Sequence, residues 1–190
     1  MKINPLYQTS RISAFLKFLE TLGLFILVNL IGGIFVLGGY FLGITSDPSM
    51  KTKLWGNLPE SWQVFYFISI IMSSIGYLAF FYNIVFKQNV GGVLTNRLIL
   101  LCVIFLLSAS LWMPLTIKVI ESNNGFFWIL TQVSLWVTAF AAIVITALLI
   151  KSPHRPKNRS YQLTMWGMSY LSFHCLVLDA ILWTNYFYKS

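Results

Sequence analysis

Residues Phe126 to Ile150 read FFWILTQVSLWVTAFAAIVITALLI and contain no charged side chain. A helix of about 20 mostly apolar residues is long enough to cross the hydrocarbon core of a bilayer. This run is apolar on every face, whereas a strand of a membrane barrel alternates apolar and polar residues over about ten positions. The run therefore predicts a membrane-spanning α-helix.

Four more apolar runs flank this one. Together they predict an all-α membrane protein, a bundle of five transmembrane helices that forms one domain over residues 1–190. The expected helices cover residues 19–43, 62–86, 97–119, 126–151 and 161–187. The last run is interrupted by His174 and Asp179.

The composition supports a protein that lies almost entirely in the membrane. Hydrophobic residues make up 57% of the chain and charged residues only 9%, whereas soluble domains carry roughly 25% charged residues. The net charge of +8 does not form a basic stripe of the kind that binds nucleic acid. Its cations lie in the loops, where we expect them to meet anionic lipid headgroups.

The distribution of Lys and Arg predicts the orientation. Nine of the 13 lie on the side that holds the amino terminus, and four lie on the other side. The first group is Lys2, Arg11, Lys17, Lys87, Arg97, Lys151, Arg155, Lys157 and Arg159, and the second is Lys51, Lys53, Lys118 and Lys189. By the positive-inside rule, a multi-pass protein with this bias has a cytoplasmic amino terminus and an outer carboxyl terminus.

Prolines and glycines indicate two irregular places. The longest connection, residues 44–61, contains Pro48, Gly56 and Pro59, which we expect to break any helix there. Pro114 lies inside the third expected helix and removes one backbone hydrogen bond, so a kink near Ser110 is expected. A kinked helix would open space inside the bundle.

Asp179 is the only acidic residue well inside an expected span, where an ionisable group is a functional hypothesis by default. It either faces a wet cavity or ties the fifth helix to a neighbour. Five residues separate it from His174, which on an α-helix turns the two side chains about 140° apart. We therefore expect no acid–base couple, and Asp179 to share its face with Cys175 and Trp183. No cluster of ligand residues suggests a metal, a cofactor or a catalytic site.

Small residues form two stripes that favour close helix packing over a pore lining. Gly39 and Gly43 form a GxxxG pair in the first span. In the fourth span, small residues recur every four positions at Ser134, Thr138, Ala142 and Thr146. Either stripe could also support a homodimer.

Five short motifs, in order along the chain, resemble those of the translocator protein / tryptophan-rich sensory protein (TspO) family. They are Gly32-Gly33-Ile34-Phe35, Leu58-Pro59-Glu60-Ser61-Trp62, Ile75-Gly76-Tyr77, Leu111-Trp112-Met113-Pro114-Leu115 and Leu178-Asp179-Ala180-Ile181-Leu182-Trp183. Three positions depart from the family pattern, one of them being Tyr170, which lacks the family's preceding proline. Ala109, between Ser108 and Ser110, stands where the family has a pocket Asn, and Asp179 replaces the Asn of the fifth helix.

The resemblance implies a TspO-like bundle whose pocket opens toward the loop between the first two helices. Its ligands would be porphyrins, sterols or other flat hydrophobic molecules, and no resident cofactor is implied. Carried over by position, the pocket would use Trp62, Trp112, Asp179 and Trp183, with Trp55 in the covering loop. Pro114 of the third-helix motif also belongs to the expected site. Leu182, Tyr186 and Lys189 loosely match the sterol motif associated with the family.

Three functions remain open at this point. The favoured one is binding of a flat lipophile for transport or sensing, with Trp62 and Trp112 stacking on its rings and Asp179 orienting it. The second is a membrane enzyme that acts on a lipid or pigment through Asp179 or His174. The third is a structural subunit of a membrane complex, with the small-residue stripes as its interface.

Overall fold

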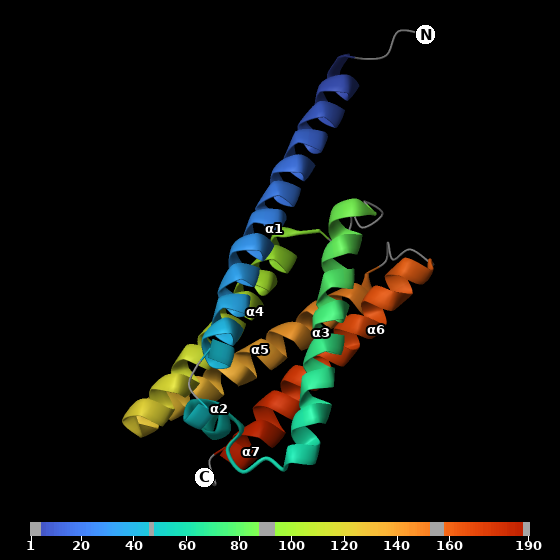
Figure 1. Ribbon diagram of the computed structural model, residues 1–190. Helices are drawn as coiled ribbons and strands as arrows, with labels where there is room; N and C mark the ends of the chain where they lie inside the picture. The colour runs from blue at the N-terminus through green and yellow to red at the C-terminus, as the bar shows by residue number, and fades with distance from the viewer. Residues whose placement is uncertain (1–4, 46–47, 88–93, 153–157, 188–190) are drawn as a thin grey trace.

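The computed structural model describes residues 5–45, 48–87, 94–152 and 158–187, and within these ranges it is helical with no strand (Figure 1). Five segments are long and apolar enough to cross a membrane, which confirms the predicted multi-pass membrane protein. They are α1 (Pro5–Thr45), α3 (Glu60–Phe86), α4 (Asn96–Ser122), α5 (Gly125–Lys151) and the continuous run of α6 (Arg159–Phe173), the π-helix η1 (His174–Trp183) and α7 (Thr184–Phe187).

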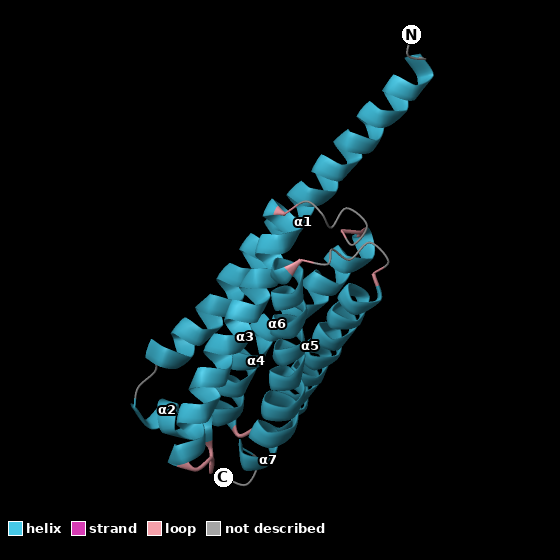
Figure 2. Cartoon of the chain, turned by 90° about the vertical axis from the view of Figure 1, so that its right-hand side faces the viewer, coloured by secondary structure: helices cyan, strands magenta, loops and turns pink. Residues whose placement is uncertain are grey.

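The spanning helices pack in the order α1, α4, α5, α6 with η1, and α3. Helix α1 also contacts α3 near Phe25, whose ring stacks on that of Phe81 with the two ring centroids 5.9 Å apart. The amino-terminal part of α1 projects beyond the other helices (Figure 2). Much of the surface of α1 and α3 consists of exposed Leu, Ile and Phe side chains, as expected where helices face lipid.

Helices α3 and α6 approach each other closely at two glycines. A Cβ placed on Gly76 would lie 2.5 Å from the carbonyl oxygen of Gly167, so neither position has room for a side chain. One end of the same contact is fixed by Asn83, whose Nδ2 donates to Oγ1 of Thr164 at 2.7 Å. Small residues at a membrane helix crossing permit this approach of the two backbones.

The small-residue stripe of α5 packs inside the bundle, as predicted. Thr138 donates to Oγ of Ser108 on α4 at 2.8 Å. Thr146 lies 2.9 Å from Oγ of Ser172 on α6. The stripe therefore joins α5 to its two neighbours.

The Gly39 and Gly43 stripe also faces a helix of the same chain. Atoms of Met113 on α4 lie 3.5 Å and 3.0 Å from the Cβ positions of Gly39 and Gly43. A homodimer stays a prediction. Both stripes suggested for its interface, however, are covered within the chain.

The expectation that residues 44–61 contain no helix is wrong. Pro48 begins the short helix α2 (Pro48–Trp55), since proline is tolerated in the first helical turn, where the missing N–H would have had no partner. Gly56 ends this helix with a left-handed φ of 55°. A Cβ on Gly56 would lie 2.8 Å from Cα of Phe187, so the glycine also lets the connection lie against α7.

Candidate ligand-binding cavity

A cavity of about 350 Å³ lies inside the bundle, and every spanning helix contributes to its wall. On α1 it extends from Asn29 to Tyr40, which corresponds to roughly 16 Å along a helix axis. Most of the lining is apolar, with several aromatic rings. This combination is typical of sites for small hydrophobic ligands.

Aromatic side chains close the end of the cavity nearest α2. Trp112 of α4 packs edge-on against Tyr40, with ring centroids 6.0 Å apart, and against Trp183 at 5.5 Å. Trp183 in turn donates from Nε1 to the carbonyl of Leu54 in α2 at 3.0 Å. Helix α2 is thus connected through Trp183 to the ring of Trp112, which lines the cavity.

The opposite end carries a polar pair whose hydrogen bonds are made within the chain. The hydroxyl of Tyr77 on α3 donates to Oδ1 of Asn29 on α1 at 2.6 Å. Nδ2 of Asn29 donates to the carbonyl of Phe25 at 2.7 Å. This pair joins α1 to α3 where the cavity begins.

The cavity opens sideways, between α1 and α3. Its strongly exposed lining residues lie only on these two helices: Leu30 is 56% exposed, Leu37 70% and Leu78 62%. By contrast, the lining residues of α4, α5, α6 and η1 are buried or half-buried. Because these exposed leucines lie within the spans, the mouth faces the hydrocarbon of the bilayer.

The expectation that His174 and Asp179 lie on different faces is wrong. Residues His174–Trp183 form a π-helix rather than an α-helix. Its i→i+5 hydrogen bonding places residues five apart on the same face. Nε2 of His174 consequently lies 3.5 Å from Oδ2 of Asp179, and both residues line the cavity.

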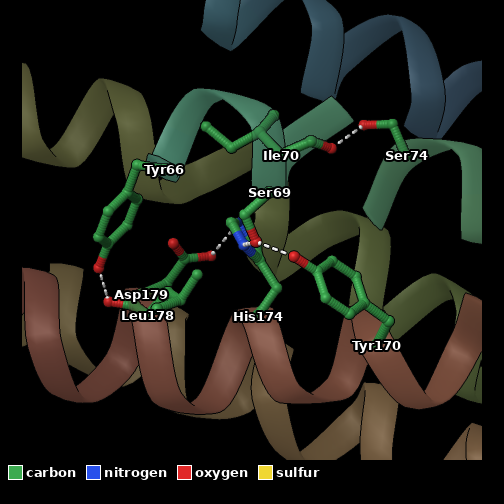
Figure 3. A network of polar contacts seen from close by, with 8 residues as sticks. All are labelled: Tyr66, Ser69, Ile70, Ser74, Tyr170, His174, Leu178 and Asp179. Carbon is green, nitrogen blue, oxygen red and sulfur yellow. Dashed lines mark hydrogen bonds and ion pairs between the residues drawn. The ribbon is translucent and has the colours of Figure 1, made fainter. Parts of the chain in front are cut away.

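Behind His174, a short polar chain reaches α3 (Figure 3). Oγ of Ser69 lies 2.8 Å from Nδ1 of His174 and 2.8 Å from the hydroxyl of Tyr170. One turn earlier on α3, Tyr66 donates its hydroxyl to the carbonyl of Leu178. These contacts hold the imidazole in one orientation and join η1 to α3.

Two polar groups on the cavity wall retain bonding capacity. The second carboxylate oxygen of Asp179 points away from His174 (Figure 3). The Asp179 side chain keeps 27% of its surface accessible, against 4% for His174. On α3, Oγ of Ser73 is buried without a hydrogen-bond partner, although Ser73 lines the cavity.

The structure separates the residues proposed for the site into two groups. Trp112 and Asp179 line the cavity, as does Ala109. The other proposed tryptophans and Pro114 are not part of its lining. Trp55 lies against Tyr66, and Trp62 lies beside Phe65 at the surface. Pro114 lies inside α4, and Trp183 packs against Trp112.

Two residues of the sterol motif, Leu182 and Tyr186, are not part of the lining either. Leu182 and Tyr186 are half-buried next to the apolar cluster around Trp183, and Lys189 lies outside the described residues. Binding by any residue of the proposed site stays a prediction.

Sequence reasoning missed four lining residues that shape the cavity: Asn29, Tyr40, Ser73 and Tyr77. Each is a polar or amphipathic residue near the middle of a span or one to three turns from its end. A signal was present for Asn29, because an amide within a hydrocarbon span needs a partner. Tyr77 was noted only as part of the Ile75-Gly76-Tyr77 motif and not as a site residue. Tyr40 gave no separate signal, since tyrosine is also common in interfacial belts.

No family model, curated protein or solved structure matches this chain. The resemblance to the TspO family stays a prediction.

Proposed function

We propose that the protein binds a flat lipophile, taken up from the bilayer, in the cavity between its five spanning helices. The observation that carries this proposal is the apolar cavity of about 350 Å³ with a lateral mouth between α1 and α3. Ligand sites in proteins commonly have volumes of roughly 300–1,000 Å³ and bury most of the ligand. A molecule of a few fused rings fits within the walls, and a larger one would project through the mouth.

Aromatic rings supply the contacts that such a ligand needs. Trp112 and Tyr40 line one end, and Phe81 and Phe105 line the other. Offset or edge-on contacts between aromatic rings contribute about 0.5–1.5 kcal/mol beyond the burial of area. A flat ring system would gain several of these contacts at once.

The TspO resemblance supports the same function. It assigns Trp112 and Asp179 to the pocket, and both line the cavity. Porphyrins, sterols or related lipophiles would then be carried or sensed. The first loop, which the resemblance places over the pocket, contains α2, and Leu54 of α2 is bonded to Trp183 behind Trp112.

The proposal is tested by binding of pyrene to the purified protein in nanodiscs, followed by energy transfer from tryptophan. Ala109→Phe places a ring in the cavity and should weaken binding about tenfold or more, a loss of at least 1.4 kcal/mol. Leu111→Phe is the matched control, because Leu111 lies on the same helix but is exposed outside the lining. Equal binding by the two variants would contradict the site.

A tryptophan comparison locates the ligand independently. Trp112→Phe should lower the affinity for pyrene several-fold, since Trp112 lines the cavity and supplies a ring contact. Trp62→Phe should leave it nearly unchanged, because Trp62 is 43% exposed at the surface. The reverse pattern would place the ligand outside the cavity.

Acid–base catalysis on a bound lipid or pigment is the second candidate, favoured by the position of His174 beside Asp179 on the cavity wall. A paired carboxylate and imidazole can accept or donate a proton. Ser69 is fully buried and does not line the cavity, so it is no nucleophile for a ligand there. Mass spectrometry of protoporphyrin incubated with the protein, in light and in darkness, tests this function. Conversion should depend on His174 and disappear in His174→Gln, and no conversion by the unmodified protein would exclude this reaction.

A further inference from the structure

Among the residues that the structure describes, Asp179 has no strong partner. Its nearest cationic candidate, Nε2 of His174, is 3.5 Å away, beyond the usual 2.7–2.9 Å of a charge-assisted hydrogen bond. Among the described residues that line the cavity, none is Lys or Arg. A carboxylate inside a membrane span is costly unless it is paired.

Aromatic rings line the same cavity as Asp179. Asp179 and Trp183 are four residues apart on η1, and the ring of Trp183 contacts that of Trp112. Trp112 contacts Tyr40, and both line the cavity together with Asp179. A carboxylate together with the face of an aromatic ring is a typical environment for an ammonium group.

A second group on the same wall points to a polar ligand atom. Ser73 of α3 lies one helical turn from Ser69, which contacts His174. Its buried hydroxyl has no hydrogen-bond partner in the protein. A buried polar atom left in this state is costly, and rotation of the Ser73 side chain toward the cavity would let a ligand satisfy it.

We propose that Asp179, with Tyr40 and Trp112 beside it, is the counter-ion site for the protonated amine of a lipophilic ligand. This inference rests on the proposed function and names the class of its ligand: an amine on a flat hydrophobic body, in preference to a neutral or an acidic one. The carboxyl groups of a porphyrin would meet Asp179 with like charge. With Asp179 in place of the family's Asn, the cavity would favour lipophilic amines over lipophilic acids.

Three probes that share one ring system test the inference in nanodiscs: 1-pyrenemethylamine, 1-pyrenemethanol and 1-pyrenecarboxylate. The unmodified protein should bind the amine about tenfold or more tightly than the alcohol, because a hydrogen bond to a charged group is stronger than a neutral one. The carboxylate should bind most weakly. Asp179→Asn should reduce the preference for the amine to about twofold or less while the alcohol still binds, and Asp179→Glu should retain the preference.

Comparing the amine-to-alcohol ratio between variants cancels the different partitioning of the two probes into lipid. Glu121→Gln is the matched control, since it removes an exposed carboxylate that pairs with Lys118 at 2.7 Å and does not line the cavity. Its ratio should equal that of the unmodified protein. Equal affinities for amine and alcohol in the unmodified protein, or an unchanged preference in Asp179→Asn, would overturn the amine site and leave lipophile binding intact. Failure of all three probes to bind would overturn both proposals.

Discussion

At the scale of single residues, the cavity wall contains side chains whose hydrogen bonds are complete and others whose bonds are not. Asn29 and Tyr77 bond to each other, and Ser74 bonds to the carbonyl of Ile70 at 2.8 Å. Ser73, next to Ser74 on α3, has no partner. A protein retains an unsatisfied buried hydroxyl at a cost in stability, and a ligand contact is a physical reason for keeping one.

Replacing Ser73 with alanine should therefore affect stability and binding in opposite directions. Without ligand, Ser73→Ala should unfold at the same temperature as the unmodified protein or slightly higher, because an unsatisfied hydroxyl is removed. Affinity for 1-pyrenemethylamine should fall by about 0.5–1.5 kcal/mol, the net value of one hydrogen bond. Thermal unfolding in detergent and the pyrene titration measure the two effects. Ser74→Ala serves as the control and should leave the affinity unchanged; an equal loss in both variants would mean that Ser73 has no special contact.

At the scale of elements, the sequence predicts the helices that the bilayer requires. Runs such as Phe126–Ile150 have no charge and no alternation, so a spanning helix was the only structure that satisfied their backbone groups. The short helix α2 was missed because Pro48 was interpreted as a breaker, although it occupies a first-turn position that needs no donor. Local composition did not distinguish these two roles of proline.

The candidate site was less predictable than the helices. Trp112 and Asp179 were identified from the sequence, and both line the cavity. The pairing of His174 with Asp179 was missed because α-helical periodicity sets residues five apart on different faces, whereas η1 is a wider π-helix. Hydrophobic patterns do not encode a change from i→i+4 to i→i+5 bonding, and π-helical turns occur frequently at functional sites. Tyr40 and Tyr77 belong to the wall only because of how α1 and α3 pack.

The crossing of α3 and α6 gives a prediction at this scale. Gly76→Ala should lower the free energy of unfolding by about 1–3 kcal/mol, as overpacking does elsewhere, because its Cβ would lie 2.5 Å from the Gly167 carbonyl oxygen. Gly38→Ala is the control, since no atom lies within 4 Å of its Cβ position. Unfolding in a titration of denaturing detergent compares the variants. Equal stability of Gly76→Ala and Gly38→Ala would show that the two helices can separate there without cost.

At the scale of the whole molecule, the orientation rests on the excess of Lys and Arg at one side. The chain suits a labelling experiment, because Cys102 and Cys175 are both buried and give little background. Thr52→Cys, on exposed α2, should react with a membrane-impermeant maleimide in intact cells. Asn96→Cys, exposed at the start of α4, should react only after the cells are opened. The opposite order of reaction would reverse the assigned topology.

The lateral mouth between α1 and α3 has a consequence for how affinity must be expressed. A ligand that arrives through Leu37 and Leu78 leaves hydrocarbon and enters another apolar environment, so transfer from water contributes nothing to that step. The relevant concentration is the mole fraction of ligand in the bilayer. At a fixed total amount of ligand, doubling the lipid dilutes it and halves the occupancy of a weakly saturated site. Selectivity among lipophiles then depends on ring contacts and head-group chemistry, since equally hydrophobic competitors gain nothing from hydrophobicity alone.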